Sequence, residues 1–99
     1  MNYRILLTDE ASKDLGDIMD YIALDAPRRA EGFVDELLDE IRSLKTMPKR
    51  CAVAPESGRR GYEMRHLIYK RYRILFTIKE AQVLILRVIH GARLLEPED

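Results

Sequence analysis

A change of hydrophobic period at Gly61 constrains the fold of this chain more than any other feature. From there to His90 apolar and polar side chains alternate, which is typical of β-strands, and short polar stretches at residues 70–71 and 79–82 interrupt the alternation. Strands joined by turns this short pair antiparallel with their sequence neighbours. Residues 61–90 are therefore predicted to form a three-stranded antiparallel meander, and its nearly all-apolar last strand is expected to be buried on both faces.

The first half of the chain has the period of a helix. Apolar side chains recur three and four positions apart in two stretches, at Ala11, Leu15, Ile18, Met19 and Ile22 and then from Ala30 to Leu44. Residues 25–27 separate the stretches, and Pro27 suits the first position of a second helix because its missing N–H costs nothing there. A connection this short predicts an antiparallel helical hairpin over about residues 9–46, with Thr8 as its N-cap.

These elements fit a single domain. Residues 3–7 are expected to form a further short strand, residues 47–60 a loop without periodicity, and residues 91–99 an irregular tail. The hairpin must bury its apolar stripe on one face of the sheet. The predicted fold class is therefore α+β, a two-layer β-α-α-β-β-β domain with the helical hairpin packed on an antiparallel sheet. Whether the first strand joins an edge or lies beside the last strand is left open.

The composition of the chain excludes several classes of protein. The chain of 99 residues has no apolar run near the ~18 residues that a membrane span needs, and its N-terminus lacks the pattern of a secretory signal. Its one cysteine, Cys51, excludes an internal disulfide and is expected to be an inert thiol in a loop. Cys51, His66 and His90 are too scattered for a zinc motif, and glycine-rich phosphate loops are missing. The sequence predicts a cytoplasmic protein without a metal or cofactor.

Charge is balanced overall but sorted along the chain. Residues 1–48 carry 6 basic and 11 acidic side chains, whereas residues 49–99 carry 11 basic and 6 acidic ones. Two interpretations are open: the acidic half complements the basic half within one domain, or the asymmetry marks a polar binding surface. The zero net charge argues against a protein that grips nucleic acid by its phosphates, because such proteins carry a clear positive excess.

Strand parity separates the two faces of the predicted sheet. Two apolar sets are expected beneath the helices: Tyr72, Ile74, Phe76 and Ile78 in one strand, and Leu84, Leu86 and Val88 in the next. The opposite face then receives Arg73, Arg87, Glu63 and Arg65. Arginines this close repel one another unless an anion satisfies them. Either they pair with carboxylates of the chain, or they form a polar surface for a phosphate or an acidic peptide; the carboxylates considered are Glu63, Glu96, Glu98 and Asp99.

His90 ends the last predicted strand and is followed by Gly-Ala-Arg93. The glycine permits a sharp exit from the strand, which brings an imidazole and a guanidinium together at the end of the sheet. A histidine in this position can act as a general acid or base near neutral pH. A structural role for the imidazole is the alternative interpretation.

Three stretches of the sequence together resemble the RelE/ParE superfamily of toxins from type II toxin–antitoxin systems. They are residues 11–22, residues 30–48 and, most specifically, residues 63–93, which include the strand Tyr72–Ile78 and the ending Arg87–Arg93, written RVIHGAR. The resemblance spans most of the chain. It implies the family's fold, a helical hairpin against an antiparallel sheet, which agrees with the hydrophobic periods.

The superfamily divides by activity, and the resemblance implies one of two targets. ParE-like members poison DNA gyrase, whereas RelE-like members cleave mRNA in the ribosome without a metal. Here Glu63 is acidic where RelE is basic, and no tyrosine follows His90. The resemblance therefore favours a ParE-like, non-enzymatic toxin that traps gyrase on cleaved DNA. The alternative is a ribosome-dependent mRNA endonuclease, with Glu63 as base, Arg65 and Arg73 holding the phosphate, and His90 as acid.

Either activity implies a cognate antitoxin as partner. Antitoxins of this system are expected to wrap the toxin with an extended C-terminal segment, which folds on binding. This segment is predicted to cross the helical hairpin and approach Arg65, Arg73 and Arg87, in a hetero-oligomer of toxin and antitoxin. The residues predicted to bind the target or the antitoxin are Arg65, Arg73, Arg87, His90 and Arg93.

Overall fold

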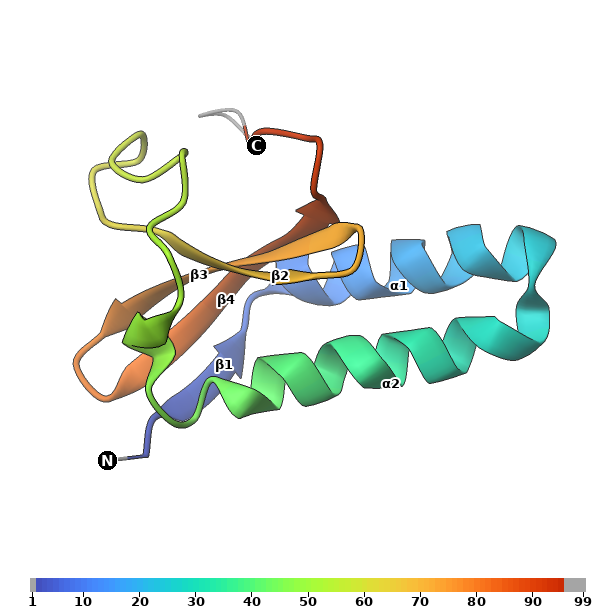
Figure 1. Ribbon diagram of the computed structural model, residues 1–99, viewed down its shortest axis with the longest axis horizontal. Helices are drawn as coiled ribbons and strands as arrows, with labels where there is room; N and C mark the ends of the chain where they lie inside the picture. Colours follow the sequence, from blue (N-terminus) through green and yellow to red (C-terminus); the bar gives the residue numbers. More distant parts are fainter. Residues whose placement is uncertain (1, 96–99) are drawn as a thin grey trace.

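The computed structural model describes residues 2–95 and places two helices against one face of a four-stranded sheet. Figure 1 shows the order of the elements and the helical hairpin extending beyond the end of the sheet. The elements are β1 (Arg4–Leu7), α1 (Asp9–Asp25), α2 (Pro27–Ser43), the short 3₁₀ helix η1 (Pro48–Arg50), β2 (Arg65–Tyr69), β3 (Tyr72–Lys79) and β4 (Gln82–His90). The predicted α+β fold class, with a helical hairpin on a sheet, is confirmed.

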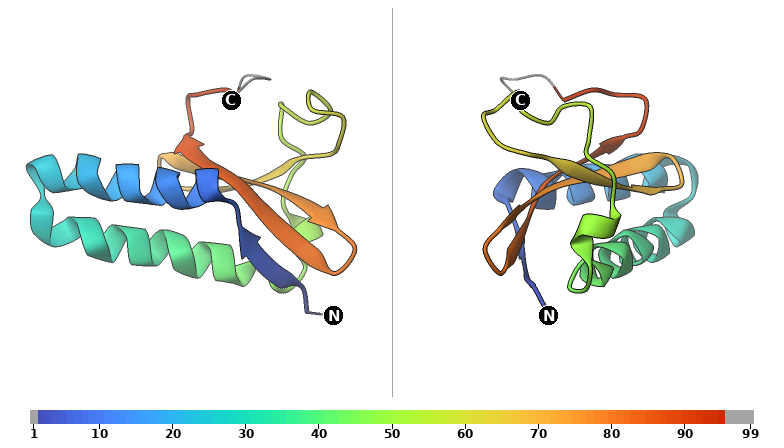
Figure 2. Two further views of the ribbon diagram at one scale, coloured as in Figure 1. Left: turned by 180° about the vertical axis from the view of Figure 1, so that it is seen from behind. Right: turned by 60° about the vertical axis from the view of Figure 1, so that its left-hand side comes forward.

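The helical hairpin begins and turns where the sequence indicates. The Thr8 hydroxyl accepts a hydrogen bond from the Ala11 N–H at 3.2 Å and donates to the Ile85 carbonyl at 2.9 Å, so the N-cap of α1 also ties this helix to β4. Pro27 occupies the first turn of α2. Only Ala26 separates the two helices, which forces them to run antiparallel, as both views of Figure 2 show.

The sheet is mixed, with the strand order β1-β4-β3-β2. The antiparallel meander predicted for the second half is confirmed, because β2 pairs with β3 and β3 pairs with β4 in antiparallel register. Its first strand begins at Arg65 rather than near Gly61. The strand left open in the sequence, β1, lies at an edge and beside β4, in parallel register from Arg4↔Gln82 to Leu7↔Ile85. Since β4 is longer than β1, the end of β4 from residue 86 onward has no strand beside it on that edge.

A β-bulge in β4 corrects one part of the predicted strand parity. Leu75 pairs with Arg87 and Phe76 pairs with Ile85, so Leu86 is an extra residue between them. The insertion reverses the alternation, and β4 therefore faces the helices with Val83, Ile85 and Val88 rather than with Leu84, Leu86 and Val88. On β3, which holds its period, the expected set Tyr72, Ile74, Phe76 and Ile78 does face the helices.

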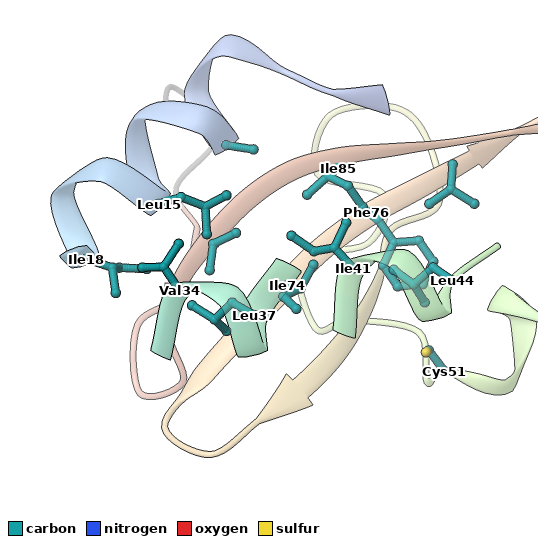
Figure 3. Close-up of a cluster of buried hydrophobic side chains, with 13 residues drawn as sticks. Leu15, Ile18, Val34, Leu37, Ile41, Leu44, Cys51, Ile74, Phe76 and Ile85 are labelled. Carbon is teal, nitrogen blue, oxygen red and sulfur yellow. The ribbon is translucent and has the colours of Figure 1, made fainter. Parts of the chain in front are cut away.

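The larger core lies between the hairpin and the sheet. Ala11, Leu15 and Ile18 of α1 and Val34, Leu37 and Ile41 of α2 pack against the apolar side chains of β3 and β4 (Figure 3). Phe76 of β3 is fully buried at the centre. Cys51 contributes to the same core, where burial raises the pKa of its thiol, in agreement with the prediction of an unreactive side chain.

A second, smaller core covers the other face of the sheet. Ala54, Met64, Leu75, Ile89 and Leu95 pack together there, with Leu86 against them. Residues 52–54 run beside β2, since the Ala54 N–H donates to the Met64 carbonyl and the His66 N–H donates to the Ala52 carbonyl. Residues 91–95 have no regular secondary structure, but Leu95 is only 1% exposed. The sheet face expected to be open is therefore covered by the chain itself.

Within residues 2–95, no helix is long enough and apolar enough to cross a bilayer.

Candidate functional site

Arg73 does not lie on an exposed face, as the sequence led us to expect. It is 4% exposed, and its guanidinium donates to the Glu56 carboxylate at 3.1 Å and to the Arg93 carbonyl at 2.6 Å. Glu56, at 1% exposed, is itself buried. The expected cluster of solvent-facing arginines is therefore wrong for Arg73, because a carboxylate from the loop neutralises it beneath the C-terminal segment.

Glu56 joins three parts of the chain. Its carboxylate binds Arg73 and also accepts a hydrogen bond from the Leu95 N–H at 2.9 Å. Burial by itself opposes ionisation, but the hydrogen bonds from Arg73 and Leu95 outweigh it and lower the pKa of Glu56 to about 2. Glu56 is thus ionised at neutral pH and holds residues 93–95 against the sheet. Sequence reasoning missed it because it lies in a loop without periodicity.

His66 is a second contact of Arg73 that the sequence did not indicate. A guanidinium nitrogen of Arg73 lies 2.9 Å from Nδ1 of His66. Because a guanidinium can only donate, Nδ1 must accept, and this assigns the ring proton to Nε2 of a neutral imidazole. Burial and the positive charge of Arg73 both lower the pKa of His66, which favours the same neutral form.

Arg87 is also paired within the chain. Its guanidinium donates to both oxygens of Asp14 on α1, at 2.7 and 3.1 Å, and the Val88 N–H donates to the same carboxylate at 2.8 Å. Asp14 therefore replaces the missing neighbouring strand along the free end of β4. Sequence reasoning missed Asp14, because nothing around it in the sequence distinguishes it from the other acidic residues of α1.

Replacing Asp14 tests this contact. We expect Asp14→Ala to lower the free energy of unfolding by about 2 kcal/mol, because it leaves the Val88 N–H and a largely buried guanidinium without this acceptor. Urea unfolding followed by circular dichroism measures the change. Asp17→Ala is the matched control on the same helix, since its pair with Lys13 is exposed to solvent and should contribute little to stability. Equal effects of the two substitutions would contradict the assignment.

Arg65 and Glu63 form a more exposed pair at the start of β2. The Nε of Arg65 lies 3.2 Å from a Glu63 oxygen, and the guanidinium also donates to the Cys51 carbonyl at 2.6 Å. The sequence left open whether the arginines pair with carboxylates of the chain. For Arg65 the structure shows such a pair, with Glu63. Glu96, Glu98 and Asp99, the other carboxylates considered, lie outside the described residues.

Glu63 and His90 lie at opposite ends of β3. His90 pairs with Tyr72 at the first residue of the strand, whereas the Glu63 carbonyl accepts a hydrogen bond from Thr77, five residues further along. At ~3.3 Å per residue the two positions are roughly 17 Å apart. The structure therefore does not bring together the base and the acid that a nuclease would need.

His90 and Arg93 are the exposed members of the predicted set. They line an open groove of about 570 Å³ between α1 and the free end of β4, together with Tyr72, Ile18 and the Arg87–Asp14 pair. The ring of His90 packs edge-on against Tyr72 at 5.8 Å, and its Nδ1 accepts a hydrogen bond from the Ala92 N–H. Gly91 suits this position, because a Cβ there would lie 3.3 Å from the Arg71 carbonyl oxygen, which is a tight contact. This groove can take a polar segment of a macromolecule.

In residues 2–95 we find no group of three or more histidine, cysteine, aspartate or glutamate side chains arranged to hold a metal ion.

The helical hairpin on one face of a small sheet agrees with the fold that the resemblance implies. Residues 5–95 match the family described as the ParE toxin of the type II toxin–antitoxin system, parDE. The chain belongs to this family. The resemblance to the RelE/ParE superfamily is thereby confirmed, and the family is ParE.

A solved structure of a chromosomal ParDE TA system from P. aeruginosa contains a similar chain. The two share 21% sequence identity with a TM-score of 0.75, and the match covers 89% of this chain and 95% of that one. At this identity the likeness shows the fold. No curated protein sequence matches the chain.

Proposed function

We propose that this ParE-family toxin acts in the cytoplasm by binding DNA gyrase and holding it on cleaved DNA. A cognate antitoxin neutralises it in a hetero-oligomer. Membership of the ParE toxin family supports the toxin–antitoxin setting of the proposal. Gyrase is the target that the resemblance implies for this branch of the superfamily.

The burial of Arg73 in an ion pair with Glu56 is the observation that favours a toxin that acts by binding over a nuclease. Cleavage of RNA at the 2′-OH needs cations that are free to hold the phosphate, and a base and an acid on either side of it. Arg73 is buried against Glu56, and Glu63 is separated from His90 by the length of five residues of β3. A chain that inhibits by docking needs none of these groups to converge.

The exposed residues of the predicted set mark where a partner can dock. Among the residues predicted to bind, Arg73 is covered by the C-terminal segment and Arg87 is held by Asp14, whereas His90 and Arg93 are exposed on the groove beside α1. An antitoxin segment that crosses the helical hairpin therefore meets His90 and Arg93 rather than Arg73.

A paired assay with the purified protein tests the function. We expect it to block supercoiling by DNA gyrase and to accumulate cleaved DNA–gyrase complex, without cutting mRNA in translating ribosomes. Glu63→Ala and His90→Ala serve as matched variants, because both side chains are exposed and both belong to the nuclease alternative. Codon-positioned cuts that disappear in these variants, with gyrase unaffected, would overturn the proposal.

A further inference from the structure

The sheet covers its backbone edge at β2 and at the end of β4, but not at β1. Residues 52–54 run along β2, where Val53 forms a bridge with Arg65, and the Asp14 carboxylate accepts the Val88 N–H at the end of β4. β1 is the outer strand of the order β1-β4-β3-β2, and within residues 2–95 no strand lies on its other side (Figure 2). Proteins usually cover or charge an edge strand, because an open one pairs with other chains.

The peptide groups of β1 alternate between its two sides. The N–H groups of Arg4 and Thr8 donate to carbonyls on the β4 side, at 2.8 and 3.1 Å. By this alternation, Ile5 and Leu7 direct their N–H and C=O groups away from β4. The Tyr3 N–H also points outward, and it donates to a carbonyl of the segment after α2 at 2.8 Å. The groups of Ile5 and Leu7 are thus the hydrogen-bonding groups that the β1 edge offers.

The side chains along the β1 edge are apolar. Leu6 and Leu7 are each 38% exposed, and they point to opposite faces of the sheet because successive side chains of a strand alternate. Arg4 is the only charged residue between Arg4 and Leu7, and the lysine or proline that protects many edge strands is missing there. A strand added to this edge therefore buries one leucine on each face.

The register of the added strand is fixed when that strand is the β1 of a second copy. Antiparallel pairing about a two-fold axis at Leu6 sets Ile5 opposite Leu7 on both sides of the axis, so that their outward N–H and C=O groups meet. An axis at Ile5 would pair Leu7 with residue 3, whose N–H is already bound, and an axis at Leu7 would pair Ile5 with residue 9, where α1 begins. At the Leu6 axis, the two Leu6 side chains lie directly opposite each other.

Charge complementarity supports the same register. It sets Arg4 opposite Thr8 of the second copy, next to Asp9 and Glu10 in the acidic first turn of that copy's α1. Arg4, Asp9 and Glu10 are all exposed. The symmetry repeats this contact on the other side of the axis, so each copy contributes one cation and one acidic turn.

From these features we infer that the β1 edge is an interface between two copies of this chain, which join their sheets through antiparallel β1 strands. A second copy supplies the outward groups at the required spacing by symmetry, and it supplies the acidic turn for Arg4. The strand has four residues, so the contact is smaller than a standard interface and the dimer is weak. The inference is independent of the proposed function, because neither gyrase nor an antitoxin takes part in it.

Sedimentation velocity of the full chain at about 5 to 500 µM tests the interface. We expect a reversible equilibrium of monomer and dimer with a Kd of about 50 µM. Amide hydrogen exchange then locates the contact: by mass action, the N–H groups of Ile5 and Leu7 should exchange about 4-fold more slowly at the highest concentration than at the lowest. Amides of β2 should be unchanged. A chain that stays monomeric overturns the inference and leaves the β1 edge to a strand of another protein, and a dimer that leaves both amides unprotected overturns it as well.

An apolar-to-lysine pair of variants tests the axis. Leu6→Lys should weaken the dimer at least ~10-fold, because it sets two cations opposite each other. Ile68→Lys is the matched control, since Ile68 is 62% exposed and lies on β2, at the opposite side of the sheet, so the Kd should not change. Circular dichroism checks that both variants fold. Equal Kd values for the two variants would exclude the β1 edge as the interface.

A charge exchange tests the register and leaves the leucines in place. Arg4→Glu should weaken the dimer about 5-fold, because a carboxylate at this position faces Asp9 and Glu10 of the second copy. The double variant Arg4→Glu/Asp9→Lys should recover most of this loss. Within one copy the two positions lie at opposite ends of an extended strand, so the recovery reports a contact between copies. A double variant that dimerises no better than Arg4→Glu would contradict the antiparallel pairing at Leu6.

Discussion

Arg73→Met should lower the free energy of unfolding by about 3–5 kcal/mol, as expected when one partner of a buried ion pair is removed. In this variant the Glu56 carboxylate, which is 1% exposed, keeps the hydrogen bond from the Leu95 N–H but loses its countercharge. The Arg93 carbonyl and Nδ1 of His66 also lose their donor. Urea unfolding measured by circular dichroism gives the change, and the m-value shows whether the C-terminal segment is released in the native state.

The double variant Arg73→Met/Glu56→Leu separates the charge from the packing. Removing both charges should recover most of the loss, because well-packed apolar side chains replace buried pairs at little cost. The coupling energy from the cycle should therefore exceed ~2 kcal/mol. Arg65→Met is the control, since it loses a pair with a Glu63 that is 60% exposed and a hydrogen bond to the Cys51 carbonyl, which together should cost about 1–2 kcal/mol. Equal costs for Arg73→Met and Arg65→Met would show that the Glu56–Arg73 pair is unimportant.

The parts of the fold that the sequence predicted are those set by local periodicity. The apolar stripe of the helix from Ala30 to Leu44 must be buried against another apolar surface. The alternation after Gly61 predicts a sheet with one apolar face, so the two-layer architecture follows. The bulge at Leu86 was not predictable in this way, because the strand is apolar on both sides of it and its composition does not mark the extra residue. The bulge changes only which face of the sheet the following side chains take.

The candidate site was less predictable, because charge partners are chosen by tertiary contacts. Arg73 meets Glu56, which is 17 positions away in a loop, and Arg87 meets Asp14, which is 73 positions away on α1. Nothing around either carboxylate in the sequence distinguishes it from its neighbours. His90 and Arg93 were found together because they are close in sequence, whereas the packing of Phe33 on Tyr72 depends on how α2 crosses the sheet.

Acid should destabilise the protein in two steps, which follow from the groups around Arg73. Glu56 has a folded-state pKa of about 2, against an ordinary value of 4.5, so the unfolded chain binds more protons between these limits. Its contribution is fully present above pH ~4.5 and is lost as the pH falls toward ~2, at a total of about 3 kcal/mol. The lowered pKa of His66 acts in the same direction and begins earlier, because the unfolded imidazole takes up a proton below its ordinary value of 6.5.

Urea unfolding at a series of pH values between 8 and 3 measures both steps. Stability should be level above pH ~7, fall slightly toward pH 5 and fall steeply below pH ~4.5. His66→Gln keeps a neutral hydrogen-bonding side chain beside Arg73 and should remove only the first step. The double variant Arg73→Met/Glu56→Leu should flatten the second step, because neither titration nor the ion pair remains there. A steep second step that persists in the double variant would place the acid-sensitive group elsewhere and would contradict the role of Glu56 in the loss of stability.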